Sequence, residues 1–288
     1  MSRSDDHYGR RGFLKRIGLA VGAAGLWGAG AAGAMEERPA EGERASGCEL
    51  SRAVQMDFMR PGQIEAAGKK FPVVYVPFGL IEWHGPHLPV GTDALKAHGI
   101  LVRCAERYGG VVFPPIYFHS WWKRAEFTVV LSELFARLKK AGFRVIMGVS
   151  GHDVKVQLAM ITEALAPVTA DGEVAGIALH EAGWHSADQE TGTDHAAKWE
   201  TADMMYLYPE LVDMGTLGEG EINLEGKPPW GITGLDPREH ASVEEGRRNI
   251  ERAADAIGKK ARELLDSLPP EKRGFSRESL VFNSWHFI

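Results

Sequence analysis

A short apolar run followed at once by a polar segment is the feature that most constrains this chain. Residues 71–78 are almost all apolar, include several β-branched side chains and lie between lysine and glycine residues, as is typical of a buried strand. Residues 82–93 then contain two histidines, two carboxylates, two glycines and two prolines. This composition predicts a loop at the carboxyl end of the strand, where open α/β sheets place their binding sites.

Strand and helix signals alternate along the rest of the chain. Further strands are predicted at 111–115, 143–149 and 174–180, and helices at 94–105, 129–140, 154–165 and 242–268. Residues 193–208 are predicted to begin as a capped loop and to continue as a helix that reaches Tyr208 and is stopped by Pro209. Residues 116–127 are predicted to form an aromatic loop, and 215–240 a loop rich in glycine and proline. This alternation indicates βαβ units, so we predict an α/β fold built on a mainly parallel sheet.

The bulk composition excludes few classes of protein. The chain has 288 residues, of which 44% are hydrophobic and 25% charged, which suffices for one sizeable domain or two small ones. The formal net charge is −6, and no block of lysine or arginine alternates with aromatic residues. The sequence therefore does not favour a nucleic-acid partner.

The N-terminus carries a twin-arginine pattern. Arg10 and Arg11 precede an apolar run over 17–34 that is rich in alanine and glycine and ends in small residues. We therefore predict a Tat export signal over 1–34, a periplasmic or otherwise exported location, and the Tat machinery as a transient partner. An uncleaved membrane anchor is the alternative, but the run is interrupted by glycine and barely reaches the roughly 18 to 20 apolar residues that a spanning helix needs.

The exported part is predicted to consist of a flexible leader and one domain. The leader covers 35–48, and the domain covers 49–288. Cys48 and Cys104 would meet an oxidising compartment, which permits a disulfide without requiring one, so the sequence leaves their pairing open.

Three segments of the chain offer metal ligands. They are Glu82, His84 and Asp93 in the first, His152 and Asp153 in the second, and His195 and Glu200 in the third. In an extended segment, residues i and i+2 point the same way, so Glu82 and His84 can face one cavity. Carboxylates and imidazoles without thiolates suit Zn²⁺ or Mn²⁺, and so acidic a set suits two ions bridged by one carboxylate. A single histidine of this kind is more often a structural or surface residue than a metal ligand. Only the common position of several of them after predicted strands favours a metal site.

Trp121 and Trp122 lie next to each other in the aromatic loop. Adjacent tryptophans in a loop commonly seal the edge of a core. The competing interpretation makes them a wall for a flat or cyclic ligand at the mouth of a site. On the second interpretation both are candidate substrate-binding residues, together with Asp153.

Segment 82–93 resembles the first signature of the creatininase (creatinine amidohydrolase) family. Residues 150–152 resemble the family's second motif and 194–201 its third, and the similarity continues through 207–212 and 231–237. The resemblance implies a three-layer α/β/α fold, a homo-oligomer that is usually a hexamer, and two divalent ions, Zn and/or Mn. It also implies hydrolysis of a C–N bond in a small-molecule amide.

The resemblance also implies roles for single residues. Glu82, Asp93 and His152 would hold one ion, and His84 with Asp93 the other, so that Asp93 bridges them. His195 matches the family's proton-transfer histidine, oriented by Asp194 or another carboxylate, and Glu200 matches the glutamate of the third motif.

The chain departs from the family in its second motif. Val154 occupies the position of a glutamate that binds metal in creatininase, so the missing ligand has to come from elsewhere. Glu200 is the first candidate and Asp153 the second. The family's Pro-Gly-Thr segment is also absent, because 126–128 lead almost directly into a predicted helix. Both departures border the substrate pocket, so creatinine is not inferred as the substrate.

The predicted function is that of a metal-dependent amidohydrolase. It would cleave a C–N bond in a small amide, which can be cyclic, with a metal-activated water. One alternative is hydrolysis of a formamide or a terminal peptide bond by the same ions. The other is an exported metal-binding protein without catalytic activity.

Overall fold

The computed structural model describes residues 48–118, 123–152, 155–181 and 194–276, which all lie in one compact unit. Several predictions fall outside the described residues: the export signal over 1–34, most of the leader over 35–48, and the positions of Trp121, Trp122, Asp153 and Val154. Among the described segments, no helix has both the length and the apolar character to cross a membrane.

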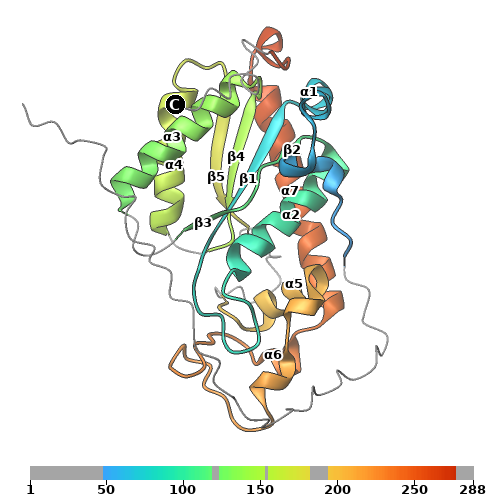
Figure 1. Cartoon of the computed structure of the whole chain (residues 1–288), viewed down its shortest axis with the longest axis vertical. Coiled ribbons are helices and arrows are strands. Elements are labelled where there is room, and N and C mark those ends of the chain that lie inside the picture. Colours follow the sequence, from blue (N-terminus) through green and yellow to red (C-terminus); the bar gives the residue numbers. More distant parts are fainter. Residues whose placement is uncertain (1–47, 119–122, 153–154, 182–193, 277–288) are drawn as a thin grey trace, which may run out of the picture. The chain divides into compact units, whose positions relative to one another are not determined.

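A five-stranded parallel sheet forms the centre of the fold (Figure 1). Its strands are β1 (Val73–Leu80), β2 (Val111–Val112), β3 (Ile116–Phe118), β4 (Val145–Ser150) and β5 (Ala175–His180). The order is β2-β1-β4-β5, and β3 also pairs with β1. Every strand pair is parallel, which confirms the predicted sheet.

Strands β2 and β3 form one interrupted edge along β1. Val111 pairs with Val74 and Ile116 with Phe78, on the side of β1 opposite to β4. Pro114 and Pro115 lie between the two strands and have no N–H to donate, so the pairing stops and then resumes. The predicted strand at 111–115 was therefore too long, and the predicted aromatic loop begins as a strand.

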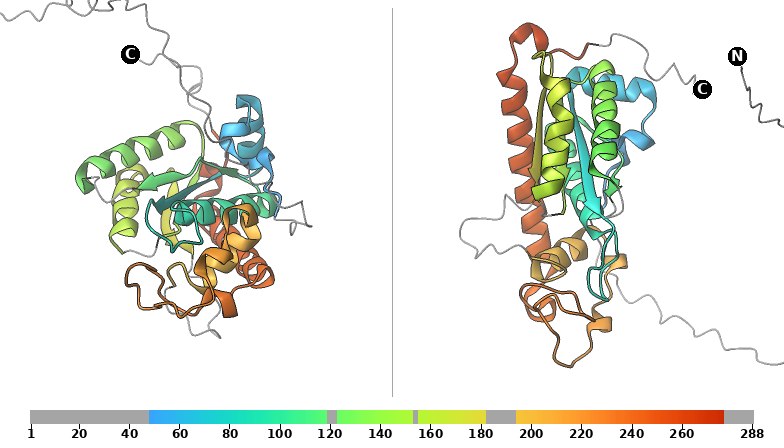
Figure 2. Two further views of the ribbon diagram at one scale, coloured as in Figure 1. Left: turned by 60° about the horizontal axis from the view of Figure 1, so that its bottom comes forward. Right: turned by 90° about the vertical axis from the view of Figure 1, so that its left-hand side faces the viewer.

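Helices cover both faces of the sheet (Figure 2). The helices α2 (Thr92–Tyr108) and α7 (Val243–Ser267) pack on one face, and α3 (Arg124–Lys140) and α4 (Lys155–Thr169) on the other. Along β1, Tyr75 belongs to the core on the α2 side, whereas Val74 and Val76 belong to the core on the α3 side. Because both faces of β1 are buried, its sequence is a continuous apolar run. The three-layer α/β/α fold is confirmed.

The described residues also form three further helices and several 3-10 turns. They are α1 (Pro61–Lys70), α5 (Lys198–Leu207) and α6 (Pro237–His240), with 3-10 turns at Arg52–Val54, Met56–Phe58, Pro209–Leu211, Met214–Leu217 and Pro270–Lys272. Pro61 occupies the first turn of α1, where no N–H is needed, so it begins this helix instead of breaking it. Cys48 and Cys104 are both free.

Close packing of α7 on α5 depends on Gly246. A Cβ atom at Gly246 would lie 1.9 Å from the carbonyl oxygen of Ala202 in α5. Helix α5 also carries Glu200, so this contact fixes the position of one predicted site residue.

We predict that Gly246→Ala lowers the free energy of unfolding by about 1–3 kcal/mol, because the added methyl group separates the two helices. Helix propensity alone would predict the opposite change, because alanine stabilises a helix by about 1 kcal/mol relative to glycine. Gly62→Ala is the matched control, since a Cβ at this helical glycine has nothing within 4 Å, and it should stabilise by about 0.5–1 kcal/mol. Urea denaturation measures both, and stabilisation by Gly246→Ala would contradict the contact.

Candidate metal centre

The polar residues of the site gather at the carboxyl ends of three neighbouring strands. Phe78 of β1 pairs with Ser150 of β4, which pairs with His180 of β5, so the three strands end at one level. Glu82 and His84 follow β1, His152 follows β4, and Glu181 follows β5. The predicted location at the end of the sheet is therefore where these side chains lie.

Asp93 reaches the same place from the first turn of α2. Its Oδ2 accepts a hydrogen bond from Leu80 N at 3.0 Å, and the positive end of the helix dipole favours a carboxylate here. A Cβ at Gly79 would lie 2.1 Å from Ala94 N, and one at Gly151 would lie 2.0 Å from Asp93 O. The two glycines thus let the start of α2 pack directly on the ends of β1 and β4.

Each oxygen of Asp93 faces a different histidine. His84 Nε2 lies 2.9 Å from Oδ1, and His152 Nδ1 lies 3.2 Å from Oδ2. Glu82 and Glu200 extend the cluster: Glu82 Oε1 lies 2.9 Å from His152 Nδ1, and Glu200 Oε2 lies 3.6 Å from His84 Nε2. A carboxylate flanked in this way has the geometry of a bridging ligand.

Within the part of the chain that the structure describes, three groups of three side chains bring one potential ligand atom each within 4.8 Å of one another. They are Glu82, Asp93 and His152; His84, Asp93 and Glu200; and Glu82, His84 and His195. The first two groups share Asp93 and contain all five residues that the sequence predicted as ligands.

The chemistry of these donors fits divalent cations. Glu82 Oε1 is buried and has no hydrogen-bond partner among the described residues, although His152 Nδ1 lies 2.9 Å away. A buried acceptor without a donor is costly, and a cation at this position would satisfy it. His84 Nδ1 donates to the Glu82 carbonyl at 3.2 Å, which leaves Nε2 as the ligand atom of the neutral ring. Imidazole and carboxylate donors of this kind suit zinc or manganese.

Protons neutralise the cluster when no ion is bound. Burial lowers the pKa of His152, but Asp93 and Glu82 outweigh this effect and raise it to about 10. Burial likewise opposes protonation of His84, yet the bond to Asp93 and the charge of Glu200 hold its pKa above the ordinary value. Burial would raise the pKa of Asp93, but the two histidines hold it below its usual range. The imidazoles thus carry protons that a metal ion would displace.

His195 is held by main-chain contacts. Its Nε2 lies 2.8 Å from the carbonyl oxygen of Trp83, which can only accept, so Nε2 carries the hydrogen and Nδ1 is free. Nδ1 lies 3.9 Å from Glu82 Oε1. The backbone of His195 exchanges two hydrogen bonds of 2.9 Å with Thr233.

Asp194 does not have the contact that was predicted for it. Its carboxylate accepts hydrogen bonds from Ala197 N at 2.9 Å and Trp199 N at 2.8 Å, because α5 begins here and its first N–H groups lack partners within the helix. Burial and the charge of Glu200 raise its pKa to about 7. The Trp83 carbonyl, and not a carboxylate, orients the His195 ring.

Lys96 is the site residue that sequence reasoning missed. Its Nζ lies 2.8 Å from Glu200 Oε1 and 2.8 Å from Glu181 Oε1, and all three side chains are buried. Glu200 Oε2 in turn accepts from Ala196 N at 2.7 Å. The available signal was a lysine one turn after Asp93 within the buried stripe of α2, where such a charge requires a partner.

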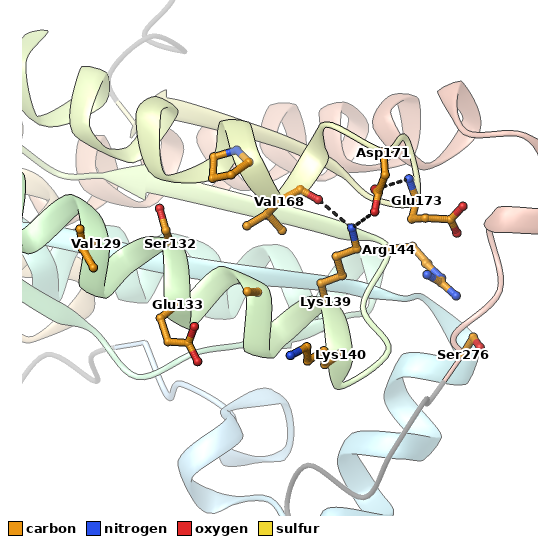
Figure 3. A pocket seen from close by; sticks show the side chains of 12 residues that line it. Val129, Ser132, Glu133, Lys139, Lys140, Arg144, Val168, Asp171, Glu173 and Ser276 are labelled. Carbon is orange, nitrogen blue, oxygen red and sulfur yellow. Dashed lines mark hydrogen bonds and ion pairs between the residues drawn. The ribbon is translucent and has the colours of Figure 1, made fainter.

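A cavity of about 600 Å³ lies between α3 and α4 and is not part of this centre (Figure 3). Lys139 Nζ donates there to Val168 O at 2.9 Å and pairs with Asp171, as Figure 3 shows. Arg144, which precedes β4, also lines it, so the cavity lies toward the amino end of that strand. None of its lining residues belongs to the three ligand groups.

Comparison with known proteins adds a family and a fold. The family model described as creatininase, creatinine amidohydrolase, matches residues 58–261. A mycofactocin precursor peptide peptidase from Mycobacterium ulcerans (strain Agy99) is 26% identical over 227 residues, covering 67% of this chain and 86% of that protein. A mutant creatininase described as Zn-Zn type has a similar fold, with a TM-score of 0.61 and 22% identity over 76% of this chain and 100% of that one. A creatininase described with Mn also has a similar fold, with a TM-score of 0.60 and 21% sequence identity over 75% of this chain and 99% of that one.

We predict that Lys96→Met lowers the free energy of unfolding by about 3–5 kcal/mol, because two buried carboxylates lose their cation. Lys96→Met combined with Glu181→Gln should recover part of this loss. Lys139→Met is the control: its partner Asp171 is 56% exposed, so at most about 1 kcal/mol is expected. Urea denaturation measures all three variants, and equal losses for Lys96→Met and Lys139→Met would contradict the buried ion pairs.

Proposed function

The chain belongs to the creatininase family, and on that basis we propose that it is an amidohydrolase of small amides that works with two divalent ions. Family membership makes the chain a metal-dependent hydrolase of C–N bonds, whereas the substrate and the roles of single residues are the proposal. The observation that carries it is the position of Asp93, whose two oxygens face His84 and His152 separately.

The proposed ligand sets follow the two groups that share Asp93. Glu82, Asp93 and His152 would hold one ion, and His84, Asp93 and Glu200 the other. Zinc and manganese are the proposed ions, supported by the donor types and by the similar creatininases described with those metals. When bound, such a pair supplies a Lewis acid for the substrate carbonyl and an acidified water as nucleophile.

Glu200 is proposed to replace the ligand that is absent at Val154. Lys96 and Ala196 N each hold one oxygen of its carboxylate, at 2.8 Å and 2.7 Å. Oε2 keeps a second lone pair and lies on the side of His84 Nε2. Asp153, the other candidate for this role, lies outside the described residues.

His195 is proposed as the proton-transfer residue. Because its Nε2 donates to the Trp83 carbonyl, Nδ1 is the basic atom, and it faces the cluster near Glu82. Nδ1 can take a proton from the attacking water and pass it to the nitrogen of the scissile bond. That transfer is needed because an amine leaves readily only when protonated, and imidazole exchanges protons near neutral pH.

A terminal peptide bond is the second candidate substrate, because one relative is named a peptidase. The same ions and the same proton transfer would serve either bond. Export through the Tat pathway, a periplasmic location and a homo-oligomer, by family resemblance a hexamer, are further proposals. They are supported by Arg10, Arg11 and the family motifs in the sequence.

We predict that the zinc-loaded protein releases amine from at least one member of a panel of lactams, primary amides, formamides and dipeptides, and that a chelator abolishes this. His195→Ala should keep its ions but lower kcat by about 10²–10⁴, because proton transfer is lost. His240→Ala is the control, since His240 lies in the last position of α6 and in none of the ligand groups. Full activity of His195→Ala would remove it from the mechanism, and a protein that binds no metal and cleaves no amide would contradict the function.

Metal binding is also predicted to release protons. His152, with a pKa of about 10, is protonated in the ion-free protein at neutral pH, and, although burial opposes it, the acidic neighbours of His84 raise its pKa as well. Since a ligand must be deprotonated, metal affinity should fall as the pH is lowered from about 8 to about 6. Calorimetry in buffers of different ionisation enthalpy counts the protons, and we expect at least one per chain. Metal uptake without proton release would contradict the assignment of His152.

A further inference from the structure

A cavity of about 500 Å³ opens beside the candidate metal centre. Glu82 and His195 form its wall on the side of the centre. The remaining walls are Trp83, Gly226, Pro228, Pro229, Gly231 and Thr233. A molecule bound at the centre would therefore have room to extend into a space lined by one tryptophan, two prolines, two glycines and a threonine.

The Trp83 side chain is exposed but fixed. It is 53% exposed, yet its Nε1 donates a hydrogen bond of 2.8 Å to the carbonyl oxygen of Trp230. Its own carbonyl accepts from His195, so ring and backbone are held from two sides. An aromatic surface that is already ordered loses little conformational entropy when a ligand covers it.

The loop that carries the two prolines is tied to the same place. Thr233 exchanges two backbone hydrogen bonds with His195, and Gly226 N donates to Ile232 O at 2.8 Å. The loop therefore keeps its position relative to His195 and Trp83. Its walls are preformed, as in most small-molecule sites.

The lining has little charge. Among the described residues that line the cavity, only Glu82 and His195 can be charged, and both belong to the proposed centre. Lys227 does not line the cavity; its side chain is 67% exposed and pairs with Glu225, which is 69% exposed. Apart from Glu82 and His195, a charged terminus would find no ion-pair partner among the described lining residues, whereas a flat uncharged ring can pack against Trp83 and the two prolines.

We propose that this cavity is the specificity subsite and that it binds a flat, uncharged group next to the scissile C–N bond. The substrate class is then an aryl or ring-containing amide, and not a peptide whose charged end would lie in the cavity. The inference rests on the proposed function and names the substrate class of the same site.

Two hydroxamates, one with a naphthyl group and one with a methyl group on the carbonyl carbon, test the subsite on the zinc-loaded protein. Calorimetry should show that 2-naphthohydroxamic acid binds about tenfold tighter than acetohydroxamic acid or more, because the ring stacks in the cavity. Trp83→Ala should remove most of that difference without weakening acetohydroxamic acid. Trp83→Phe, which keeps a flat ring, should retain most of it. Phe58→Ala is the matched control, because Phe58 is also 53% exposed but does not line the cavity.

The outcomes separate this inference from the proposed function. If neither hydroxamate binds the zinc-loaded protein, the metal centre itself is contradicted. If both bind with equal affinity, or if Trp83→Ala weakens both equally, the centre stands and the subsite is overturned. Selective loss of the naphthyl compound in Trp83→Ala, with retention in Trp83→Phe, supports the subsite.

Discussion

The buried carboxylate of Asp93 is shared by both imidazoles of the cluster. Its Oδ1 faces His84, while its Oδ2 faces His152 and also accepts the Leu80 N–H. These contacts require three elements to meet at Asp93: the end of β1, the end of β4 and the first turn of α2. The glycines at the ends of the two strands allow this approach, because a methyl group at Gly151 would overlap the Asp93 carbonyl. The fold can therefore be understood as the arrangement that holds one carboxylate between two histidines.

Charge compensation around Asp93 takes two forms. Lys96 is a permanent cation that forms buried ion pairs with Glu181 and Glu200. The protons on His84 and His152 are an exchangeable cationic charge, because they can be replaced by metal ions at the same positions. Lys96 thus offsets part of the negative charge of Glu181 and Glu200 whether or not ions are bound. The open side, with His195 and the cavity beside Trp83, is the part that a substrate can reach.

Local patterns predicted much of this from sequence. Strand β1 and helix α7 were evident because burial follows the strand and helix periods, and Glu82, His84 and Asp93 because they lie close together in the chain. Strand β3 was missed because Pro114 and Pro115 resemble the end of a strand, although they only interrupt its pairing. The partners of Lys96, Asp194 and Trp83 were missed because they come from distant segments and main-chain atoms, which no local pattern reveals. The family resemblance suggested Glu200 as the replacement for a missing metal ligand, which the spacing of residues in the sequence could not have done.

The central claim is that Asp93 bridges two divalent ions, and counting bound metal tests it most directly. The protein is exchanged into zinc, desalted and analysed by mass spectrometry, beside Asp93→Asn and the exposed control Asp171→Asn. The account predicts about two ions per chain for the wild type and the control, as in two-metal sites. Asp93→Asn can still accept the Leu80 N–H but should lose at least one ion and bind the other more weakly. Two ions held with unchanged affinity by Asp93→Asn would contradict the account.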